Sequence, residues 1–488
     1  MASETSVNIL EVTRVTPSLH SPKSSTECSL PLTFSDFHWL KFHPVDRVFF
    51  YELTDLTPTF FNSTLVPKLK RSLSLTLLHF LPFAGNITWP DDQRIIKPFI
   101  LYTPNDGVSV TVAESNADFT DISGNQIREV VKSSLYVPEL PVSDSKAATI
   151  AFQITLFPNQ GFSIGVSSHH AVFDGKSVTV FIRAWASICK QIQDHQHHQN
   201  TDSYSLPEEL TPFLDRTVFQ DPYGLDMIYL KNWSEAKLPG LNLNNPRSLK
   251  LFQLKDSIEN SFRATFVLNL EDIKKLRRKI VSELDNPDNY FSRFVISYSY
   301  ASVCLIKAIK PEKKTRVILV FTADIRARLS PPIPANYFGN CVRSYPMYTE
   351  AEPILAQNGV SFVAEKLSER IKRLETEPPV IYEEAKDQLG RYIKVMEQMA
   401  SGDEKQDVTG EPKVIAIGTA GSTNFQVYGA EFGQGKPKKV EVSSLENGSI
   451  SMAESGDGNG GVEIGLVLEN KDELEKFDFL FVNGLKNL

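Results

Sequence analysis

The chain has 488 residues, of which 41% are hydrophobic, 23% charged and 10% aromatic, and 51 Lys plus Arg face 59 Asp plus Glu. This is the composition of a globular protein with enough chain to bury a large core. A formal net charge of -8 argues against nucleic acid as the default partner, because phosphate binding needs a basic face.

Cysteine usage and the apolar runs predict a cytosolic protein. Cys28, Cys189, Cys304 and Cys341 are widely spaced and form no CxxC pair, which favours a reducing compartment over a disulfide framework. The first fifteen residues lack the basic and then apolar pattern of a secretory signal. No run of about 18 apolar residues occurs, so we expect no membrane partner, and we expect a monomer.

Helical and strand periodicities alternate along the chain. Apolar spacing predicts helices over 64–80, 172–189, 270–284, 294–308 and 360–375. Alternation predicts strands over 148–156, 162–167, 264–269, 316–322, 414–427 and 462–468. Asn269 is expected to cap the helix 270–284 with Asp272 three residues on, and the run 456–461 is expected to form a hairpin turn. The interspersed helices and strands predict a mixed α/β fold.

Two polar segments interrupt these patterns and indicate surface loops. Residues 401–412 form one, and residues 191–202 form the other, which contains His195, His197 and His198. A histidine cluster is compatible with metal binding, but low-complexity polar sequence without cysteine is more typical of a solvated linker. We therefore expect no metal site there and place a linker near residue 200.

The strongest chemical signal is SHHAVFDGKS at Ser168–Ser177, where a predicted strand ends and a helix begins. A histidine held at such a junction can present one ring nitrogen to a cavity while the rest of the residue is fixed, as a general base requires. An isolated HxxxD pattern, however, is more often a set of capping and core residues.

Other reaction classes lack their motifs. The sequence has no HExxH zinc motif, no GxSxG at a strand-to-helix turn, and no GxGxxG or P-loop where a strand feeds a helix. A histidine base without a protein nucleophile suggests direct group transfer between two bound substrates.

Motif order resembles a known family. HHAVFDG (His169–Gly175) resembles the HHxxxDG signature of CoA-dependent acyltransferases, and the segment 428–440 resembles the DFGWG box of plant BAHD acyltransferases. LPFAGN precedes the first of these motifs, DIRARLSPP and YFGNCV lie between the two, all in the family's order, and the likeness runs through nearly the whole chain. Among the branches of this family, the residues of these motifs are most similar to those of the flavonoid, anthocyanin and phenolic glucoside malonyltransferases. Condensation domains share only HHxxxDG and are rejected.

The resemblance implies two chloramphenicol-acetyltransferase-like domains, with mixed sheets and flanking helices and an active-site channel between them. The domains are expected at residues 1–190 and 226–488, joined by a crossover linker at 191–225. By family mechanism, His170 takes a proton from an acceptor hydroxyl as that oxygen attacks the acyl thioester. His169 is expected to be structural, because only one of two adjacent residues on an extended segment faces the channel.

The resemblance also assigns supporting residues. Asp174 is expected to point away from His170 and to pair with Arg326, with Gly175 completing the motif. The second-motif loop comprises Glu431, Phe432, Gly433, Gln434 and Gly435, in which Glu431 and Gln434 replace the usual Asp and Trp. These replacements indicate an altered acceptor or a catalytically weak enzyme.

Substrate contacts are predicted from charge and aromaticity. Basic candidates for the CoA phosphates are Lys274, Lys275, Arg278 and Lys436, although charge clusters are usually solvated faces. Lys176 and Arg183 are candidates for the carboxylate of a malonyl donor. Phe37, Trp39 and Gln434 are candidates for the acceptor pocket, although core packing explains Phe37 and Trp39 equally well.

Two hypotheses follow. The first is an O-acyltransferase without permanently bound cofactor or metal, moving a malonyl group from malonyl-CoA to a hydroxyl of a phenolic, flavonoid or anthocyanin glucoside. Its partners are then acyl-CoA and a small-molecule acceptor. The alternatives are transfer of a hydroxycinnamoyl or other acyl group to a different specialised-metabolite acceptor, or a weakly catalytic binding protein on the same scaffold.

Overall fold

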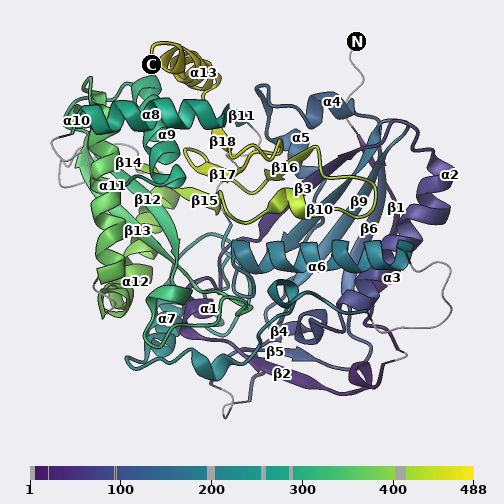
Figure 1. Cartoon of the computed structure of the whole chain (residues 1–488). Helices are drawn as coiled ribbons and strands as arrows, with labels where there is room; N and C mark the ends of the chain where they lie inside the picture. The colour runs from purple at the N-terminus through teal and green to yellow at the C-terminus, as the bar shows by residue number, and fades with distance from the viewer. Residues whose placement is uncertain are drawn as a thin grey trace.

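The computed structural model describes residues 6–19, 21–92, 94, 96–194, 204–253, 260–284, 290–376, 379–401 and 414–488. The fold is mixed α/β with two domains, as predicted, and Figure 1 shows a sheet with its covering helices in each half. Two large apolar clusters form the cores: one draws on residues from both halves of the chain, and the other on residues from Ala264 to Phe481.

A six-stranded sheet organises the first domain. Its strand order is β1 (Val7–Val15), β6 (Val108–Ser115), β9 (Ile150–Phe157), β10 (Gly161–Ser168), β3 (Val45–Glu52) and β16 (Lys439–Val442). Only β6 and β9 pair in parallel. Both β9 and β10 are buried along their whole length, which confirms the two strands predicted there.

Helices cover one face of this sheet. The long helix α6 (Gly175–Asp194) lies across it in Figure 1, and α3 (Val66–Thr76) packs beside α6. The indole Nε1 of Trp185 on α6 donates to Ser72 Oγ on α3 at 2.9 Å. A smaller sheet, with the strand order β2 (Cys28–Pro31), β5 (Phe99–Tyr102), β4 (Asn86–Thr88) and β8 (Lys146–Ala148), lies at the bottom of Figure 1. The same half of the chain contains the short helices α1 (Phe34–His38), α4 (Phe119–Ile122) and α5 (Val131–Ser134).

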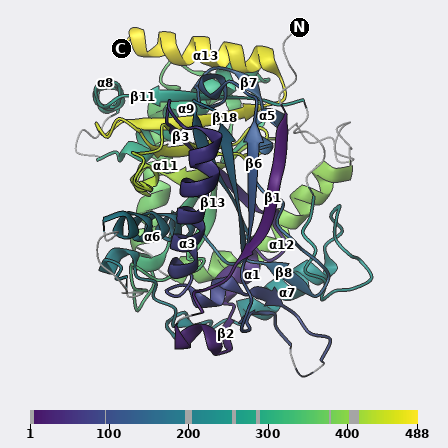
Figure 2. The ribbon, with the colours of Figure 1, turned by 90° about the vertical axis from the view of Figure 1, so that its right-hand side faces the viewer.

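The second domain contains a five-stranded and a three-stranded sheet. The first has the order β15 (Thr419–Ser422), β17 (Ile450–Glu454), β18 (Val462–Leu468), β11 (Phe262–Leu268) and β7 (Arg128–Glu129). The second has the order β13 (Val342–Glu350), β12 (Arg316–Asp324) and β14 (Val414–Ile417). The helices are α7 (Leu225–Glu235), α8 (Leu270–Ser282), α9 (Arg293–Ile309), α10 (Ala351–Leu355), α11 (Gly359–Thr376), α12 (Pro379–Ser401) and α13 (Lys471–Lys486). Figure 2 shows α13 across the top of this domain and β1 at the outer edge of the other.

The two domains exchange strands. β16 comes from the last sixty residues yet pairs with β3 of the first domain, and β7 comes from the first half yet pairs with β11 of the second. The predicted domain boundaries at residues 190 and 226 therefore remain predictions. They do not separate the sheets, because each half of the chain contributes a strand to a sheet of the other. Part of the expected linker, 195–203, lies outside the described residues, as do residues 402–412 of the loop predicted at 401–412.

Most predicted helices are confirmed with small shifts at their ends. α8 begins after Asn269, whose side chain accepts from the Asp272 N–H at 2.9 Å while Asp272 accepts from the Asn269 N–H at 3.1 Å. This is the reciprocal cap that the sequence predicts. The hairpin turn at 456–461 joins antiparallel β17 and β18.

One helical and one strand prediction are wrong in part. The helix expected over 64–80 begins earlier, as α2 (Pro58–Phe60), because Thr57 Oγ1 accepts from the Phe60 N–H and Pro58 occupies the first turn. It then passes through a single π-helical stretch at Phe61–Leu65 and ends as α3 at Thr76. The strand expected over 414–427 is two short strands, β14 and β15, in different sheets. Helix α12 was not predicted from the sequence.

Candidate active site

His170 lies in the loop between the end of β10 and the start of α6. The neighbouring His169 shapes this loop, because its N–H donates to the Thr149 carbonyl at 2.9 Å and its carbonyl accepts from the Val172 N–H at 2.9 Å. His169 Nδ1 also accepts from the Ala171 N–H at 3.2 Å. The His169 side chain is therefore enclosed, whereas His170 keeps a partly accessible surface.

An indole covers one face of the His170 ring. The Trp39 and His170 rings stack with centroids 4.0 Å apart and planes 3° apart, and Phe42 meets the imidazole edge-on at 6.0 Å. Desolvation by this environment lowers the pKa of His170 to about 4, although its own carbonyl and the Asp174 carboxylate oppose the shift. The imidazole is thus neutral at pH 7 and has a lone pair available to accept a proton.

Hydrogen bonds between buried side chains position the backbone of His170. Asn340 Nδ2 donates to the His170 carbonyl at 2.8 Å. Asp36 Oδ1 accepts from both the backbone N–H and Nδ2 of Asn340, each at 3.1 Å, and Asp36 Oδ2 is held by the N–H and hydroxyl of Thr33 at 2.8 Å. The sequence alone does not reveal a role for Asp36 or Asn340, because no local pattern links two residues 304 positions apart.

Asp174 pairs with Arg326, as the sequence analysis expects. Its Oδ2 accepts from Arg326 Nη2 at 2.8 Å and from the Cys341 N–H at 3.1 Å, and its Oδ1 accepts from the Ser177 N–H at 2.8 Å. Burial by itself would raise the pKa of Asp174, but the guanidinium and the Ser177 N–H hold it below its usual value. The carboxylate is therefore ionised and bonded away from His170.

Arg326 ties this carboxylate to the second half of the chain. Besides Asp174, it donates to the carbonyls of Tyr337 at 3.1 Å and Gly339 at 3.0 Å, and to Asp324 Oδ1 at 3.1 Å. Its side chain is 3% exposed, and that of Asp174 is fully buried. The ion pair thus fixes the turn before α6 against the loop that carries Asn340.

Aromatic side chains surround the Trp39 side of His170. Phe42 stacks on Tyr392 of α12 at 4.9 Å and meets Trp233 of α7 edge-on at 5.8 Å. Phe37 instead lies in the core, and its carbonyl accepts from Trp233 Nε1 at 2.9 Å. Of the two aromatic residues proposed for an acceptor pocket, the structure brings Trp39 to His170 and leaves Phe37 inside.

The second-motif loop packs at the other end of α6 from His170. Phe432 is buried against Trp185 in an edge contact at 4.8 Å, and its carbonyl accepts from Cys189 Sγ. Glu431 pairs with Lys190 at 3.0 Å. At 1.5 Å per residue, these helix positions lie roughly 15–22 Å along α6 from Gly175. The structure therefore does not bring this loop next to His170.

Glycines make the turn of this loop possible. Gly433 has φ +83° and Gly435 has φ +88°, in the left-handed region that favours glycine. A Cβ on Gly433 would lie 2.1 Å from Gln193 Oε1. Gln434 between them is half-buried.

The predicted cations lie in different places. Lys176 is partly exposed and pairs with Asp324 at 3.6 Å, and the Arg183 side chain lies against Gly429, with Nε 3.2 Å from where a glycine Cβ would be. Lys274 and Arg278 are exposed on α8 and both pair with Glu271, at 3.7 and 3.2 Å. Lys275 is half-buried and Lys436 is exposed.

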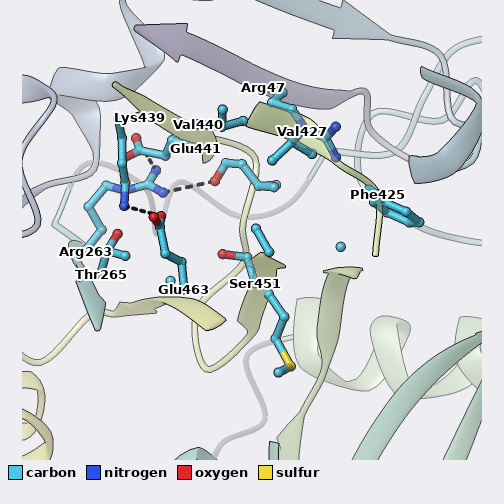
Figure 3. Close-up of a pocket in the computed structure, with 15 residues that line it drawn as sticks. Arg47, Arg263, Thr265, Phe425, Val427, Lys439, Val440, Glu441, Ser451 and Glu463 are labelled. Carbon is cyan, nitrogen blue, oxygen red and sulfur yellow. Dashed lines mark hydrogen bonds and ion pairs between the residues drawn. The ribbon is translucent and has the colours of Figure 1, made fainter. Parts of the chain in front are cut away.

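Lys439, three residues after the exposed Lys436, is buried. Its Nζ donates to Glu463 Oε2 and to Asn125 Oδ1, each at 2.9 Å. Nearby, Glu441 is bonded by Arg128 and pairs with Arg263 at 3.0 Å. These groups lie between β16 and the strands β11 and β18 (Figure 3), so Lys439 belongs to a buried group of ion pairs.

The described residues contain no group of three or more His, Cys, Asp or Glu side chains placed to hold a metal ion. No helix among them has the length and apolarity that crossing a membrane requires.

Comparison with known proteins gives consistent matches over the whole chain. The model of the Transferase family matches residues 5–480. The chain is 42% identical to the malonyl-CoA:anthocyanidin 5-O-glucoside-6''-O-malonyltransferase of Arabidopsis thaliana, with 98% of each protein covered. It is also 42% identical to phenolic glucoside malonyltransferase 1 of the same plant, with 99% of each covered.

Solved structures share the fold. Vinorine synthase superposes with a TM-score of 0.66 at 19% identity, with 98% of each chain covered. TRI101 of F. sporotrichioides, in complex with coenzyme A and T-2, superposes with a TM-score of 0.59 at 13% identity, with 93% of this chain and 97% of that chain covered.

Proposed function

The chain belongs to the Transferase family, in its BAHD branch of acyl-CoA-dependent acyltransferases, and on that premise we propose that it transfers a malonyl group from malonyl-CoA to a hydroxyl of a phenolic, flavonoid or anthocyanin glucoside. The relatives at 40–42% identity over almost the full length carry names of this activity. Acyl-CoA is a co-substrate in this family and not a resident cofactor. We further propose that the protein acts as a cytosolic monomer.

His170 is the proposed general base. Its neutral imidazole accepts the proton of the acceptor hydroxyl while the hydroxyl oxygen bonds to the thioester carbonyl carbon. When the tetrahedral intermediate collapses, the carbon–sulfur bond breaks, and the imidazolium returns the proton to the CoA thiolate. The observation that supports this role is the low pKa of a partly accessible imidazole held by Trp39 and Asn340.

The acceptor is proposed to lie on the aromatic side of His170. Trp39, Phe42 and Tyr392 present flat rings there. Planar phenolic rings stack favourably on such surfaces. Gln434 and Phe37 were also predicted for this pocket. Gln434 lies on the second-motif loop and Phe37 lies in the core, so Trp39, which contacts His170, is the best supported of the three.

The CoA phosphates are proposed to contact the exposed basic side chains of α8 and Lys436. Exposed cations bind phosphates through salt-sensitive attraction. The Michaelis constant for acyl-CoA should therefore rise with ionic strength, and should do so less in a Lys274→Gln, Lys275→Gln, Arg278→Gln triple variant. An unchanged salt dependence in that variant would remove α8 from the CoA site.

The test of the function is a donor and acceptor panel. The protein is incubated with malonyl-, acetyl- and coumaroyl-CoA and with anthocyanin, flavonoid and phenolic glucosides, and free CoA is titrated with a thiol reagent. We expect release with malonyl-CoA and a glucoside, and the loss of about 10²–10⁴-fold in His170→Ala that removal of a general base produces. Release that stays at the His170→Ala background for every pair tried would refute the proposal.

His169→Asn serves as the matched control. The asparagine oxygen can still accept from the Ala171 N–H, so the loop geometry is retained. We expect its turnover to remain well above that of His170→Ala. If His169→Asn lost more turnover than His170→Ala, His169 and not His170 would be the general base.

A further inference from the structure

A small cavity lies between the sheets of the two domains (Figure 3). The space in it that is open to the centres of water molecules is about 30 Å³, and one bound water needs roughly 10–15 Å³ by that measure. Strands β3, β11, β15, β16, β17 and β18 and the loop after β15 line it. It therefore has room for a small polar group.

The charged groups around this cavity are paired, with one exception. Glu441 is bonded by Arg128 and Arg263, and Glu463 is bonded by Lys439. Arg47 makes no ion pair within the described part of the chain, and its one hydrogen bond joins Nη1 to Thr179 Oγ1 at 2.8 Å. Figure 3 shows Arg47 beside Val427 and Phe425, apart from the paired groups.

The charge of this cavity is therefore not balanced. Its lining contains three cations, Arg47, Arg263 and Lys439, against the carboxylates of Glu441 and Glu463. Arg47 is 5% exposed. A buried guanidinium without a counter-charge is costly, and native proteins usually pair such a group.

Burial lowers the pKa of Arg47 to about 10, and Glu454 opposes that shift from beyond ion-pair distance. Glu454 Oε1 accepts from the Tyr428 N–H at 3.2 Å, and its Oε2 has no hydrogen-bond partner among the described residues. Since no carboxylate of the described residues lies within ion-pair distance of Arg47, its guanidinium can take an external anion as its partner.

The cavity adjoins the catalytic loop. Thr179, which holds Arg47, donates its hydroxyl to the Gly175 carbonyl at 2.7 Å. The Phe425 ring, which lines the cavity, lies 2.7 Å from where a Cβ on Gly175 would be. Arg47 therefore reaches the first turn of α6, directly after the loop that carries His170 and Asp174.

We propose that Arg47 binds the free carboxylate of a dicarboxylic acyl donor and so selects malonyl-CoA over acetyl-CoA. This inference rests on the proposed function and names the residue that sets its donor class. A planar guanidinium and a carboxylate form two parallel hydrogen bonds, which a neutral acyl group cannot make. The space in the cavity is enough for a carboxylate.

The other candidate cations have partners or lie elsewhere. Lys176 pairs with Asp324. Arg343 is 1% exposed and none of its nitrogens has a hydrogen-bond partner, but its guanidinium packs on the rings of Phe34 at 5.0 Å and Tyr229 at 5.5 Å. Arg343 is thus a second buried arginine away from the cavity, and it provides a matched control.

The test compares donors in Arg47→Met and Arg47→Gln. We measure kcat/KM with malonyl-CoA and with acetyl-CoA for one glucoside, and the affinity of each CoA ester by calorimetry. Loss of a buried charge pair predicts a drop of roughly 100-fold for malonyl-CoA, with acetyl-CoA changed less than about threefold. Arg47→Lys keeps the charge and should retain part of the preference.

Arg343→Met is the control for the loss of a buried arginine away from the cavity. It should change both donors by the same factor, and thermal unfolding shows which variants fold. Equal losses for both donors in folded Arg47→Gln, or no loss, overturn the inference while leaving the proposed function intact. A wild-type protein that accepts acetyl- or coumaroyl-CoA but not malonyl-CoA overturns the proposed donor itself, and the inference with it.

Discussion

The indole of Trp39 and the imidazole of His170 lie face to face, with centroids 4.0 Å apart and planes 3° apart. This contact fixes the ring plane of the base and excludes water from one of its faces. Because desolvation is the main cause of the low pKa of His170, the stack also keeps the base neutral over a wide pH range.

Removal of the stack should therefore move the acid limb of the pH profile. In the wild type, kcat/KM should fall as the pH drops through about 4, where His170 becomes protonated. In Trp39→Ala, water reaches the ring and the pKa returns toward about 6.5, so the same fall should occur at higher pH. An acid limb that does not move would show that the stack does not control this pKa.

The same shift affects stability. His169 has a pKa lowered to about 3 and His170 one lowered to about 4, in both cases by burial. Below pH 6.5 the unfolded chain binds more protons at these sites than the folded chain, so the free energy of unfolding falls as the pH is lowered toward 4. His170→Gln should reduce this slope in chemical denaturation measured between pH 4 and 6.5. The slope of a variant with both histidines intact, such as Lys274→Gln, serves as the control.

The buried and exposed carboxylates on Arg326 should differ in their effect on folding. Asp174 is fully buried and Asp324 has a side chain 40% exposed. Asp174→Asn leaves Arg326 without its buried counter-charge and should cost about 3–5 kcal/mol in the free energy of unfolding. Asp324→Asn removes a solvated pair and should cost at most about 1 kcal/mol.

Urea denaturation of both variants measures this difference. If Asp174→Asn unfolds like the wild type and only its turnover falls, then Asp174 acts in the reaction and is not a support of the loop.

Asn340 should act as a positioning residue. Asn340→Ala removes the bond to the His170 carbonyl and one of the two bonds to Asp36 Oδ1, which still accepts from the backbone N–H of residue 340. A misplaced base loses turnover, and displacements near 1 Å can cost about 100-fold. We expect kcat to fall with little change in the Michaelis constants, and Asn340→Asp to restore little, since a carboxylate cannot donate to the carbonyl. A change confined to the Michaelis constants would contradict this role.

The second-motif loop should tolerate the residues typical of its family. Gln434 is half-buried at the far end of α6, where Phe432 packs on Trp185. Gln434→Trp combined with Glu431→Asp should therefore change kcat by less than a factor of about ten, and far less than the general-base variant does. A gain of that size or more would show that the natural sequence is impaired at this loop, as the binding-protein hypothesis requires.

Local sequence determined the elements that depend on neighbouring residues. The alternation in β9 and β10, the cap of Asn269 on α8 and the glycine turn before β18 all follow from periods and caps that act over a few residues. The HHAVFDG loop is local in the same sense, and the resemblance to a family correctly paired its Asp174 with Arg326 across 152 positions.

Tertiary structure decided what depends on distant segments. Asp36, His170 and Asn340 come from three parts of the chain and meet only because the sheets pack, and Trp39 reaches His170 in the same way. The exchange of β7 and β16 between domains buries Lys439 and leaves Arg47 beside a cavity. A charged residue on an exposed helix and one in a domain interface have the same letter in the sequence, and only burial and the available partners distinguish them.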